Sequence, residues 1–413
     1  MKKIGIICEY NPFHNGHMYH INKIKELASP DIIILVMSGA FSSRGDLSIF
    51  DKFTKTAQAL DAGVDLVIEL PLVYTMQRAD LFSKYSTDIL NLARVDEIWI
   101  GSEDNNIKLY EKTYQNYKSS FELHNGNSLK KETLDLLPFK SNDILGFFYY
   151  KNIKDNNYKI ELKTIKRETS YNEDTPTHNV LTSAKAIRNN LNLLDDYTPN
   201  FVSNDKDKTL DENKLFNYLK YEINSKSKDE LKQIFLVDEG LENKLFDINK
   251  YDDYNNFIET LISKRYTKSR IKRMLIYVLL NIKKDDINKI QKEKINYIRV
   301  LGYSNKGKEY LNEIKKDVLI YTNIKNGIND ILDIELKTSK ILDLIYNLNL
   351  FNQEQQGPKR SWKTAPLFYH LFFLTTSDVS VRKSKNSSGL SITAWAALSF
   401  LGIALWYSLS SDV

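Results

Sequence analysis

Short apolar runs alternate with amphipathic segments along the first hundred residues. The runs are rich in β-branched residues and are bounded by turns, which is typical of buried strands. The segments between them carry apolar residues at helical spacing. This pattern predicts strands at 3–10, 31–39, 65–71 and 97–102, with helices at 17–28, 50–63 and 79–93. Apolar strands that alternate with helices indicate an α/β fold with a doubly wound parallel sheet.

The rest of the chain divides by composition. A helix is predicted at 141–153, a strand at 158–167 and a helix at 181–191, followed by the polar stretch 203–214. From about residue 210 to 350 the chain has helical periodicity and little glycine, which predicts a mostly α-helical region. We therefore predict an α/β domain at 1–202, an α-helical domain at 203–355 and an atypical tail at 356–413.

The tail differs sharply from the preceding chain. It holds three of the four tryptophans, and residues 390–409 form an uncharged stretch long enough to span a bilayer. Arg382, Lys383 and Lys385 precede it, which would keep the rest of the chain on the cytoplasmic side. The tail is either a membrane anchor or a segment foreign to the working protein, and the abrupt change in composition favours the second interpretation.

Charge and cysteine content limit the class of protein. A formal net charge of +5 over 413 residues is too small by itself to indicate a nucleic-acid partner. Cys8 is the single cysteine of the sequence, which excludes an internal disulfide and a cysteine-based zinc site and fits a reducing compartment. We expect a cytoplasmic protein, with residues 390–409 leaving membrane tethering as an alternative.

The stretch MKKIGIICEYNPFHNGHMYH holds three of the six histidines, at His14, His17 and His20. A strand, a turn and a helix N-terminus form the usual phosphate site of α/β proteins, and imidazoles that donate to phosphate can stabilise charge in phosphoryl transfer. A metal site is less favoured, because zinc would need a third or fourth ligand and supporting carboxylates, and Glu9 is the only acid nearby in the sequence. An ordinary helix that happens to carry histidines is the third interpretation. The segments that follow the first four strands should converge on one cleft with this loop: Glu9–His17, Met37–Gly45, Glu69–Leu72 and Gly101–Glu103.

The residues His14-Asn15-Gly16-His17 resemble the HxGH signature of the nucleotidylyltransferase superfamily, whose Rossmann-like domain binds ATP. A longer series of motifs resembles the bacterial tRNA(Met) cytidine acetate ligase family: GIICEYNPFHNGHMYHI, VMSGAFSSRGD, DLVIELP, IGSE, NDILGFFY, IKR and SAKAIR, in this order. The resemblance extends from residue 3 to about 352.

The resemblance implies a two-step reaction. Acetate and ATP would give acetyl-adenylate and pyrophosphate, and the acetyl group would pass to N4 of the wobble cytidine, position 34, of elongator tRNA(Met). ATP is then a substrate, and Mg²⁺ is expected to accompany its triphosphate without a dedicated carboxylate cage. The residues implied to bind ATP are Ile7, Cys8, Glu9, Tyr10, Asn11, Pro12, Phe13, His14, Asn15, Gly16, His17, Met18, Tyr19, His20, Gly101, Asn142, Arg167, Ser183 and Arg188.

Within this set, His14 and His17 are the implied catalytic residues. Gly101 would let the nucleotide approach the backbone; the alternative is an ordinary turn glycine at the end of a strand. Asn142 would bind the ribose or the base; the alternative is an N-cap of the helix that follows. Arg167 offers a guanidinium fork suited to phosphate. Ser183 and Arg188 belong to SAKAIR, which resembles the second motif of the superfamily, and Arg44 is a weaker candidate for binding phosphate. The alternative for Arg167 and Arg188 is that they are ordinary solvated charges.

Residues 264–273 carry six basic side chains and no acid: Lys264, Arg265, Lys268, Arg270, Lys272 and Arg273. Tyr266 lies among them and could stack on a base. We expect this segment to bind the tRNA backbone, although an ordinary charged helix face is the alternative.

Two rival functions stay open. An HxGH-type adenylyltransferase or ligase could act on a small-molecule carboxylate or phosphate without RNA, but it would have no use for the basic segment. A regulatory module that binds nucleotide without turnover would not need so many groups directed at phosphate. No protein partner is predicted, and the oligomeric state stays open.

Overall fold

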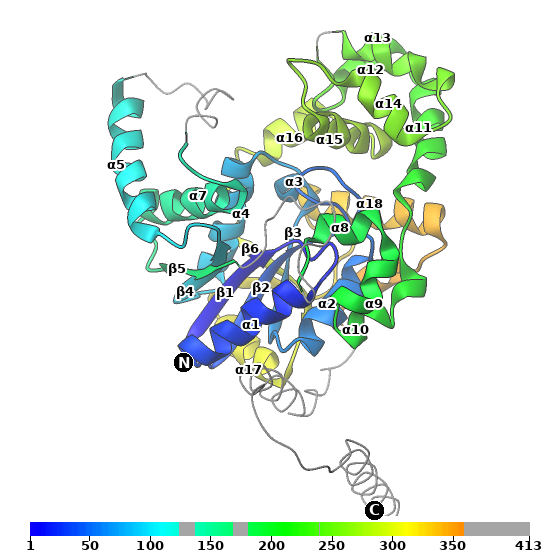
Figure 1. The fold of residues 1–413 in the computed structure, drawn as a ribbon. Coiled ribbons are helices and arrows are strands. Elements are labelled where there is room, and N and C mark those ends of the chain that lie inside the picture. Colours follow the sequence, from blue (N-terminus) through cyan, green and yellow to red (C-terminus); the bar gives the residue numbers. More distant parts are fainter. Residues whose placement is uncertain (124–136, 168–180, 239, 359–413) are drawn as a thin grey trace, which may run out of the picture. The chain divides into compact units, whose positions relative to one another are not determined.

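The computed structural model describes residues 1–123, 137–167, 181–238 and 240–358. In this part of the chain a seven-stranded sheet has the order β5-β4-β1-β2-β3-β6-β7 (Figure 1). The strands are β1 (Lys3–Cys8), β2 (Ile32–Ser38), β3 (Leu66–Leu70), β4 (Glu97–Ser102), β5 (Glu161–Lys166), β6 (Tyr297–Tyr303) and β7 (Leu319–Tyr321). The first five strands run parallel, whereas β6 is antiparallel to β3 and β7 is parallel to β6.

Helices connect the strands and form a separate group after β5. Those interleaved with the sheet are α1 (Asn15–Ala28), α2 (Lys52–Asp61), α3 (Leu72–Thr75), α4 (Ala79–Leu92), α5 (Ile107–Leu123), α7 (Ser141–Asp155), α17 (Asn305–Ile314), α18 (Asp330–Tyr346) and α19 (Leu350–Gln356). Those between β5 and β6 are α8 (Ala184–Asn189), α9 (Leu194–Tyr197), α10 (Asn200–Ser203), α11 (Leu215–Asn224), α12 (Lys228–Gln233), α13 (Leu241–Leu245), α14 (Tyr254–Leu261), α15 (Lys268–Leu279) and α16 (Lys284–Ile290).

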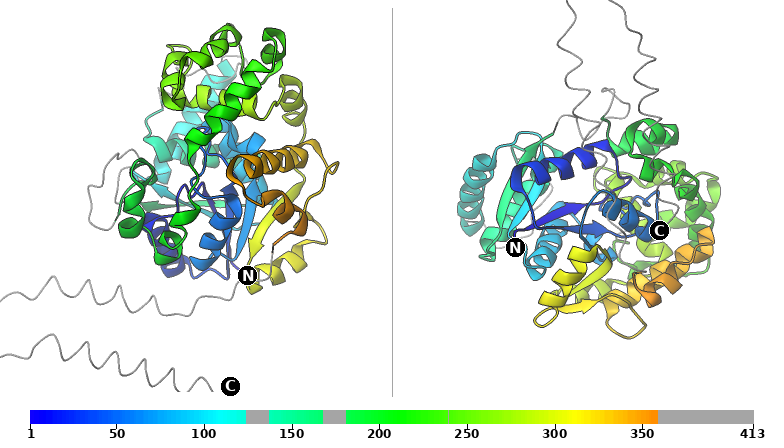
Figure 2. Two further views of the ribbon diagram at one scale, coloured as in Figure 1. Left: turned by 90° about the vertical axis from the view of Figure 1, so that its right-hand side faces the viewer. Right: turned by 90° about the horizontal axis from the view of Figure 1, so that it is seen from below.

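The central strands are buried on both faces because helices cover both sides of the sheet. All seven residues of β2 are buried, and alternate residues point to opposite faces. Ile33, Leu35 and Met37 pack with residues of α1 and α2, whereas Ile34 and Val36 pack with residues of α4 and α7. Figures 1 and 2 show α1 and α4 on opposite sides of the sheet. The predicted doubly wound α/β fold is confirmed.

Two strands were not predicted. β6 and β7 lie within the region 203–355 that we expected to be α-helical, yet they extend the sheet next to β3. The segment YIRVLGY is as long as β2, but it lies between segments of helical periodicity and was assigned to the same helical region. The expectation of an all-parallel sheet is corrected by β6, and the domain boundary at residue 203 stays a prediction.

The tail lies almost entirely outside the described residues, and so does its hydrophobic stretch 390–409. Within the described ranges, no helix is long and apolar enough to cross a membrane. The two interpretations of the tail stay open.

Candidate active site

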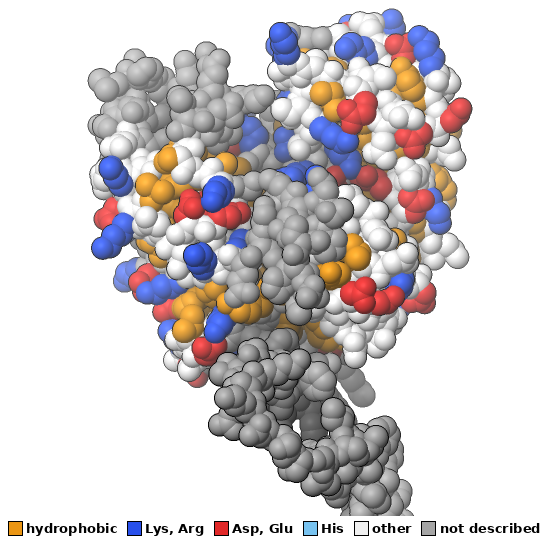
Figure 3. All heavy atoms as spheres, in the orientation of Figure 1, with side chains coloured by type: hydrophobic (Ala, Val, Ile, Leu, Met, Phe, Trp, Pro, Cys, Tyr) orange, Lys and Arg blue, Asp and Glu red, His pale blue; other side chains and the backbone are white. Residues whose placement is uncertain are grey.

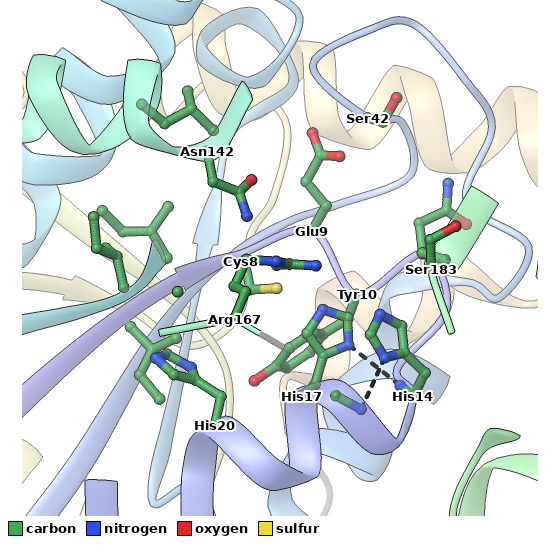
Figure 4. Close-up of a pocket in the computed structure, with 18 of the residues that line it drawn as sticks. Cys8, Glu9, Tyr10, His14, His17, His20, Ser42, Asn142, Arg167 and Ser183 are labelled. Atoms are coloured by element: carbon green, nitrogen blue, oxygen red, sulfur yellow. Dashed lines mark hydrogen bonds between the residues drawn. The ribbon is translucent and has the colours of Figure 1, made fainter. Parts of the chain in front are cut away.

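A pocket opens at the carboxyl ends of β1, β4 and β5, where the N-termini of α1, α7 and α8 also meet (Figure 4). The strand order places β2 on one side of β1 and β4 on the other, so the pocket lies at the topological switch point of the sheet, where α/β proteins bind their ligands. Helix N-termini directed at the same space favour an anionic ligand.

Fifteen of the nineteen residues predicted to bind ATP line this pocket. They are Ile7, Cys8, Glu9, Tyr10, Asn11, His14, Gly16, His17, Tyr19, His20, Gly101, Asn142, Arg167, Ser183 and Arg188. Pro12, Phe13, Asn15 and Met18 are not among the lining residues. Phe13 is fully buried and its ring contacts those of Tyr10 and His17, so it supports the loop from behind.

The loop between β1 and α1 begins where β1 ends at Cys8, two residues earlier than predicted. Tyr10 has a positive φ of 45°, which ends the extended conformation. The side chain of Asn11 then fastens the loop, since Oδ1 accepts from the Ile49 N–H at 2.9 Å and Nδ2 donates to the Leu47 carbonyl at 3.2 Å. Asn11 therefore positions the loop through its side chain.

His14 and His17 form the N-cap of α1. The Nδ1 atom of His14 accepts from the Gly16 N–H at 3.0 Å, and the Nδ1 atom of His17 accepts from the His14 N–H at 3.2 Å. The two rings lie 3.8 Å apart between centroids. Because each Nδ1 is an acceptor, a neutral imidazole must carry its proton on Nε2. Each ring is thereby left with one N–H donor for a ligand.

The three histidines are neutral at pH 7. Burial, followed by the charges of Arg167 and Arg188, lowers the pKa of His14 to about 3. Burial also lowers the pKa of His17 well below its usual range, and the pKa of His20 to about 4. The His20 Nε2 atom is buried and has no hydrogen-bond partner among the described residues. The first turns of α1 therefore offer polar N–H groups without positive charge.

Gly101 and Arg167 are neighbours at the ends of β4 and β5. A Cβ atom at position 101 would lie 3.2 Å from the Arg167 Cγ, so a side chain there would press on the arginine. The Arg167 N–H donates to the Ser102 carbonyl at 2.9 Å and continues the strand pairing. The glycine thus makes room for Arg167 as well as for a ligand.

The remaining predicted residues come from two helix N-termini. Asn142 is in the first turn of α7. Ser183 is the N-cap of α8, and its Oγ accepts from the Ala186 N–H at 3.1 Å. Arg188 donates from Nη1 to the Asn11 carbonyl at 2.5 Å. Part of the donor capacity of Arg188 is therefore used to join α8 to the first loop.

The segment after β2 forms another wall of the pocket. Ser42, Ser43 and Arg44 line it, as expected from the predicted convergence of Met37–Gly45, and Asp46, just beyond that segment, lines it too. The segment Glu69–Leu72 after β3 was expected to converge there too, and it does not. Glu69 is fully buried and pairs with Lys52 at 2.7 Å, away from the pocket lining.

Sequence reasoning missed several lining residues. Phe82, Trp99, Leu145 and Tyr149 are apolar or aromatic side chains that close the pocket from β4, α4 and α7. Their positions resemble ordinary core positions in sequence, so no signal distinguished them. Lys166 and Lys185 add positive charge to the wall. No group of three or more His, Cys, Asp or Glu side chains able to hold a metal ion occurs in the described ranges.

The predicted basic segment is only partly exposed. Lys272 is buried and pairs with Asp46 at 2.6 Å and Glu212 at 2.7 Å. Arg273 donates from Nη1 to the carbonyls of Ser43 and Gln77, each at 3.0 Å.

Acids from elsewhere in the chain pair with two further basic residues of the segment. Arg270 pairs with Asp238, and Lys268 pairs with Glu259. Figure 3 accordingly shows positive and negative side chains mixed over the region of α11 to α16. Tyr266 is buried beneath Arg265 and Arg270, so the expectation that it stacks on a base is wrong in this structure. The expectation of an exposed, unbalanced patch is likewise wrong for Lys272.

Comparison with known proteins agrees with the geometry of the pocket. The model of the HIGH Nucleotidyl Transferase family matches residues 1–357. A tRNA(Met) cytidine acetate ligase of Staphylococcus aureus strain MRSA252 is 36% identical over 334 residues, covering 76% of this chain and 87% of the relative. The protein of that name from strain JH9 has the same identity and coverage.

Solved structures give the same result. Thermotoga maritima TmcAL bound with alpha-thio ATP is 28% identical and aligns with a TM-score of 0.70, covering 86% of this chain and 96% of that chain. The apo form aligns with a TM-score of 0.71. The chain therefore belongs to the HIGH nucleotidyl transferase family and, within it, to the tRNA(Met) cytidine acetate ligases.

Proposed function

We propose that this chain is an ATP-dependent ligase that acetylates N4 of the wobble cytidine of tRNA(Met). The observation that carries the proposal is the pair of neutral, Nε2-protonated imidazoles at the N-terminus of α1, in a pocket that also holds Arg167 and Arg188. The S. aureus relatives are named for this reaction, and a T. maritima structure has an ATP analogue bound.

In the first step, an acetate oxygen attacks the α-phosphorus of ATP, and the bond to pyrophosphate breaks. Acetate is already ionised at pH 7 and needs no base. Negative charge grows on the phosphoryl oxygens, where fixed N–H donors act most effectively. His14 and His17 supply such donors, and Arg167, Lys166 and Lys185 supply positive charge along the same wall.

In the second step, N4 of cytidine attacks the acetyl carbon of acetyl-adenylate. A C–N bond forms, the C–O bond to AMP breaks, and AMP leaves with the electron pair. The amine loses one proton. The donors that stabilised the first transition state then hold the phosphate of the leaving AMP.

Mg²⁺ would accompany ATP as the counter-ion of its triphosphate. The pocket wall has two carboxylates among the described residues, Glu9 and Asp46, and Asp46 is already paired with Lys272. This donor set fits a cation that arrives with ATP and keeps most of its water ligands. When bound, the ion would neutralise phosphate charge.

We assign the tRNA-binding surface to the exposed part of the basic segment, Lys264, Arg265 and Lys268, with Arg270 at its edge. Lys272 and Arg273 belong to the same segment, but their role is to hold it against the pocket wall. Their partners Asp46 and Ser43 are pocket residues, so the segment lies beside the site where the cytidine must enter.

The test is to incubate the full chain with labelled acetate, ATP, Mg²⁺ and unmodified elongator tRNA(Met), and then to analyse the tRNA nucleosides by mass spectrometry. Labelled N4-acetylcytidine is expected. Acetyl-adenylate without labelled tRNA would overturn the RNA step and favour the rival ligase that acts on a small molecule.

A further inference from the structure

Glu9 is the first residue after β1, and its carboxylate lies in the pocket wall. Its Oε1 atom accepts from the Ser43 N–H at 2.6 Å. No protein donor within the described residues is found at Oε2. Figure 4 shows the carboxylate directed away from the histidines, toward the side of the pocket where Asn142 and Ser42 lie. One oxygen is thus fixed and the other faces the cavity.

Glu9 is held firmly. Its backbone carbonyl accepts from the Lys55 Nζ at 3.0 Å, and Lys55 is fully buried with further bonds to the Ser38 carbonyl at 2.8 Å and the Ser48 hydroxyl at 3.1 Å. Ser43, the donor to Oε1, is itself held because its carbonyl accepts from Arg273. A carboxylate fixed at both the main chain and one oxygen is preorganised for a specific contact.

Several other ionisable groups of the pocket are poorly suited to accept a proton. Burial lowers the pKa of His20 to about 4, and Figure 4 shows its ring on the side of the pocket away from the Glu9 carboxylate. His14 and His17 use their basic Nδ1 atoms as caps and present N–H groups instead. Burial raises the pKa of the Cys8 thiol to about 12, so no thiolate is present at neutral pH. Asp46 accepts from both Lys272 and Ser42. Glu9 is the carboxylate of the described wall that keeps an uncommitted oxygen.

We propose that Glu9 binds the exocyclic amine of the target cytosine through Oε2 and takes the N4 proton during acetyl transfer. This inference rests on the proposed function and identifies a residue for its second step. Carboxylates are the side chains that accept from cytosine N4–H₂. As the N4–C bond forms and AMP leaves, the N4–H bond breaks and its proton passes to Glu9, which returns it to water.

The test separates the two steps in the variant Glu9→Gln, whose amide oxygen can still accept from the Ser43 N–H. Acetate-dependent exchange of pyrophosphate into ATP reports the first step, and labelled acetate in tRNA reports the second. Loss of a general base lowers rates by about 10²- to 10⁴-fold. We expect the transfer rate to fall by this factor and the exchange rate to fall far less.

Glu26→Gln provides the matched control, because Glu26 is an exposed residue of α1 that pairs with Lys23. It should leave both rates unchanged. Glu9→Asp keeps a carboxylate on a shorter side chain and should recover part of the transfer rate, which a purely structural role would not predict.

Two outcomes overturn the inference. Equal losses in both steps would assign Glu9 to ATP or its cation, and unchanged transfer would remove it from the reaction. In both cases the wild-type chain still acetylates tRNA, so the proposed function stands. The proposed function itself would fail if the wild-type chain transferred no acetate to tRNA.

Discussion

At the residue scale, the two histidines of the first loop have a structural and a chemical task that can be separated. Nδ1 of His14 caps α1, and Nε2 is left as the donor. Asparagine is a good N-cap residue, but its shorter side chain places no donor where the His14 Nε2–H lies. A single substitution can therefore remove the chemistry and keep the helix end.

We expect His14→Asn to leave the melting temperature nearly unchanged at pH 7.5 while acetate-dependent pyrophosphate exchange falls by about 10²- to 10³-fold, the usual effect of losing one transition-state donor. Thermal unfolding and exchange assays on the same preparation check this. Exchange that survives within threefold would show that His14 is only a cap.

Buried neutral histidines also make stability depend on pH. The pKa of His14 is about 3 in the folded chain, against about 6.5 when unfolded. The unfolded chain therefore binds more protons below pH 6.5, and the stabilisation present above that pH is lost as the pH falls toward 3. Between pH 6.5 and 5 this residue should account for about 2 kcal/mol of the free energy of unfolding.

Urea unfolding at pH 7.5 and pH 5 measures this loss. We expect a smaller decrease in His14→Asn than in the wild-type chain, by roughly 2 kcal/mol. Equal decreases in the two proteins would contradict a lowered pKa for His14.

The residues of the first loop could be predicted from sequence because they are contiguous and follow a strand. Their contacts could not, since Glu9 depends on Ser43, which is 34 positions away. The cap formed by two histidines was also not foreseen. Ser, Thr, Asp and Asn are the usual capping residues, and none is at position 14.

At the element scale, α15 shows why a charged segment is difficult to interpret from sequence. Six basic residues without a neighbouring acid indicated an exposed face. The folded chain supplies Asp46 and Glu212 to Lys272 from 226 and 60 positions away. Burying a cation is tolerable when it is paired this closely. The amphipathic period of the helix was predicted, but its partners were not.

Lys272→Met should therefore destabilise the chain by about 3 kcal/mol, the low end of the cost of breaking a buried pair, because two partly exposed carboxylates lose their buried cation. Lys268→Met is the matched control on the same helix, where an exposed pair with Glu259 contributes about 0–1 kcal/mol. Urea unfolding of both variants gives the comparison. A similar stability for the two would mean that the Lys272 pairs are not formed in solution.

The exposed basic residues should act on RNA alone. Replacing Lys264, Arg265 and Lys268 by alanine should weaken tRNA binding and reduce the slope of log K against log salt by about 0.7–0.9 for each phosphate that is no longer bound. Filter binding at several salt concentrations measures the slope. An unchanged slope would show that this surface does not bind the tRNA.

At the scale of the whole molecule, a buried ion cluster joins early and late parts of the described chain. Lys52 of α2 pairs with Glu69 of β3, Glu335 of α18 and Glu354 of α19, and Glu354 also pairs with Arg299 of β6. Two of its members, Glu69 and Arg299, lie on the paired strands β3 and β6. The sequence pattern could not show it, because the cluster joins residues as far apart along the chain as Lys52 and Glu354.

The cluster is electrically balanced only if one acid is protonated. Burial, together with the neighbouring Glu69, raises the pKa of Glu335 to about 8. The cluster then holds two cations and two carboxylates at pH 7. Glu335→Gln, which mimics the protonated acid, should change the free energy of unfolding by less than about 1 kcal/mol at pH 7, whereas Glu354→Gln should lower it by about 3–5 kcal/mol.

Unfolding measured across pH adds a second check. The folded chain binds the Glu335 proton up to pH 8 while the unfolded chain releases it above about 4.3. This residue therefore stabilises the fold fully at low pH, and its contribution declines as the pH rises toward 8. Glu335→Gln should remove that decline. A strong loss of stability in this variant at pH 7 would show that Glu335 is ionised in the cluster.

If the loop between β1 and α1 activates acetate with ATP, as we propose, the chain should catalyse acetate-dependent exchange of labelled pyrophosphate into ATP. The wild-type full chain, supplied with Mg²⁺, should exchange label when acetate is added and not in its absence. His17→Ala should reduce that exchange by about 10²- to 10³-fold. Absence of exchange with acetate or any other carboxylate, in a folded wild-type chain, would show that this loop does not activate a carboxylate.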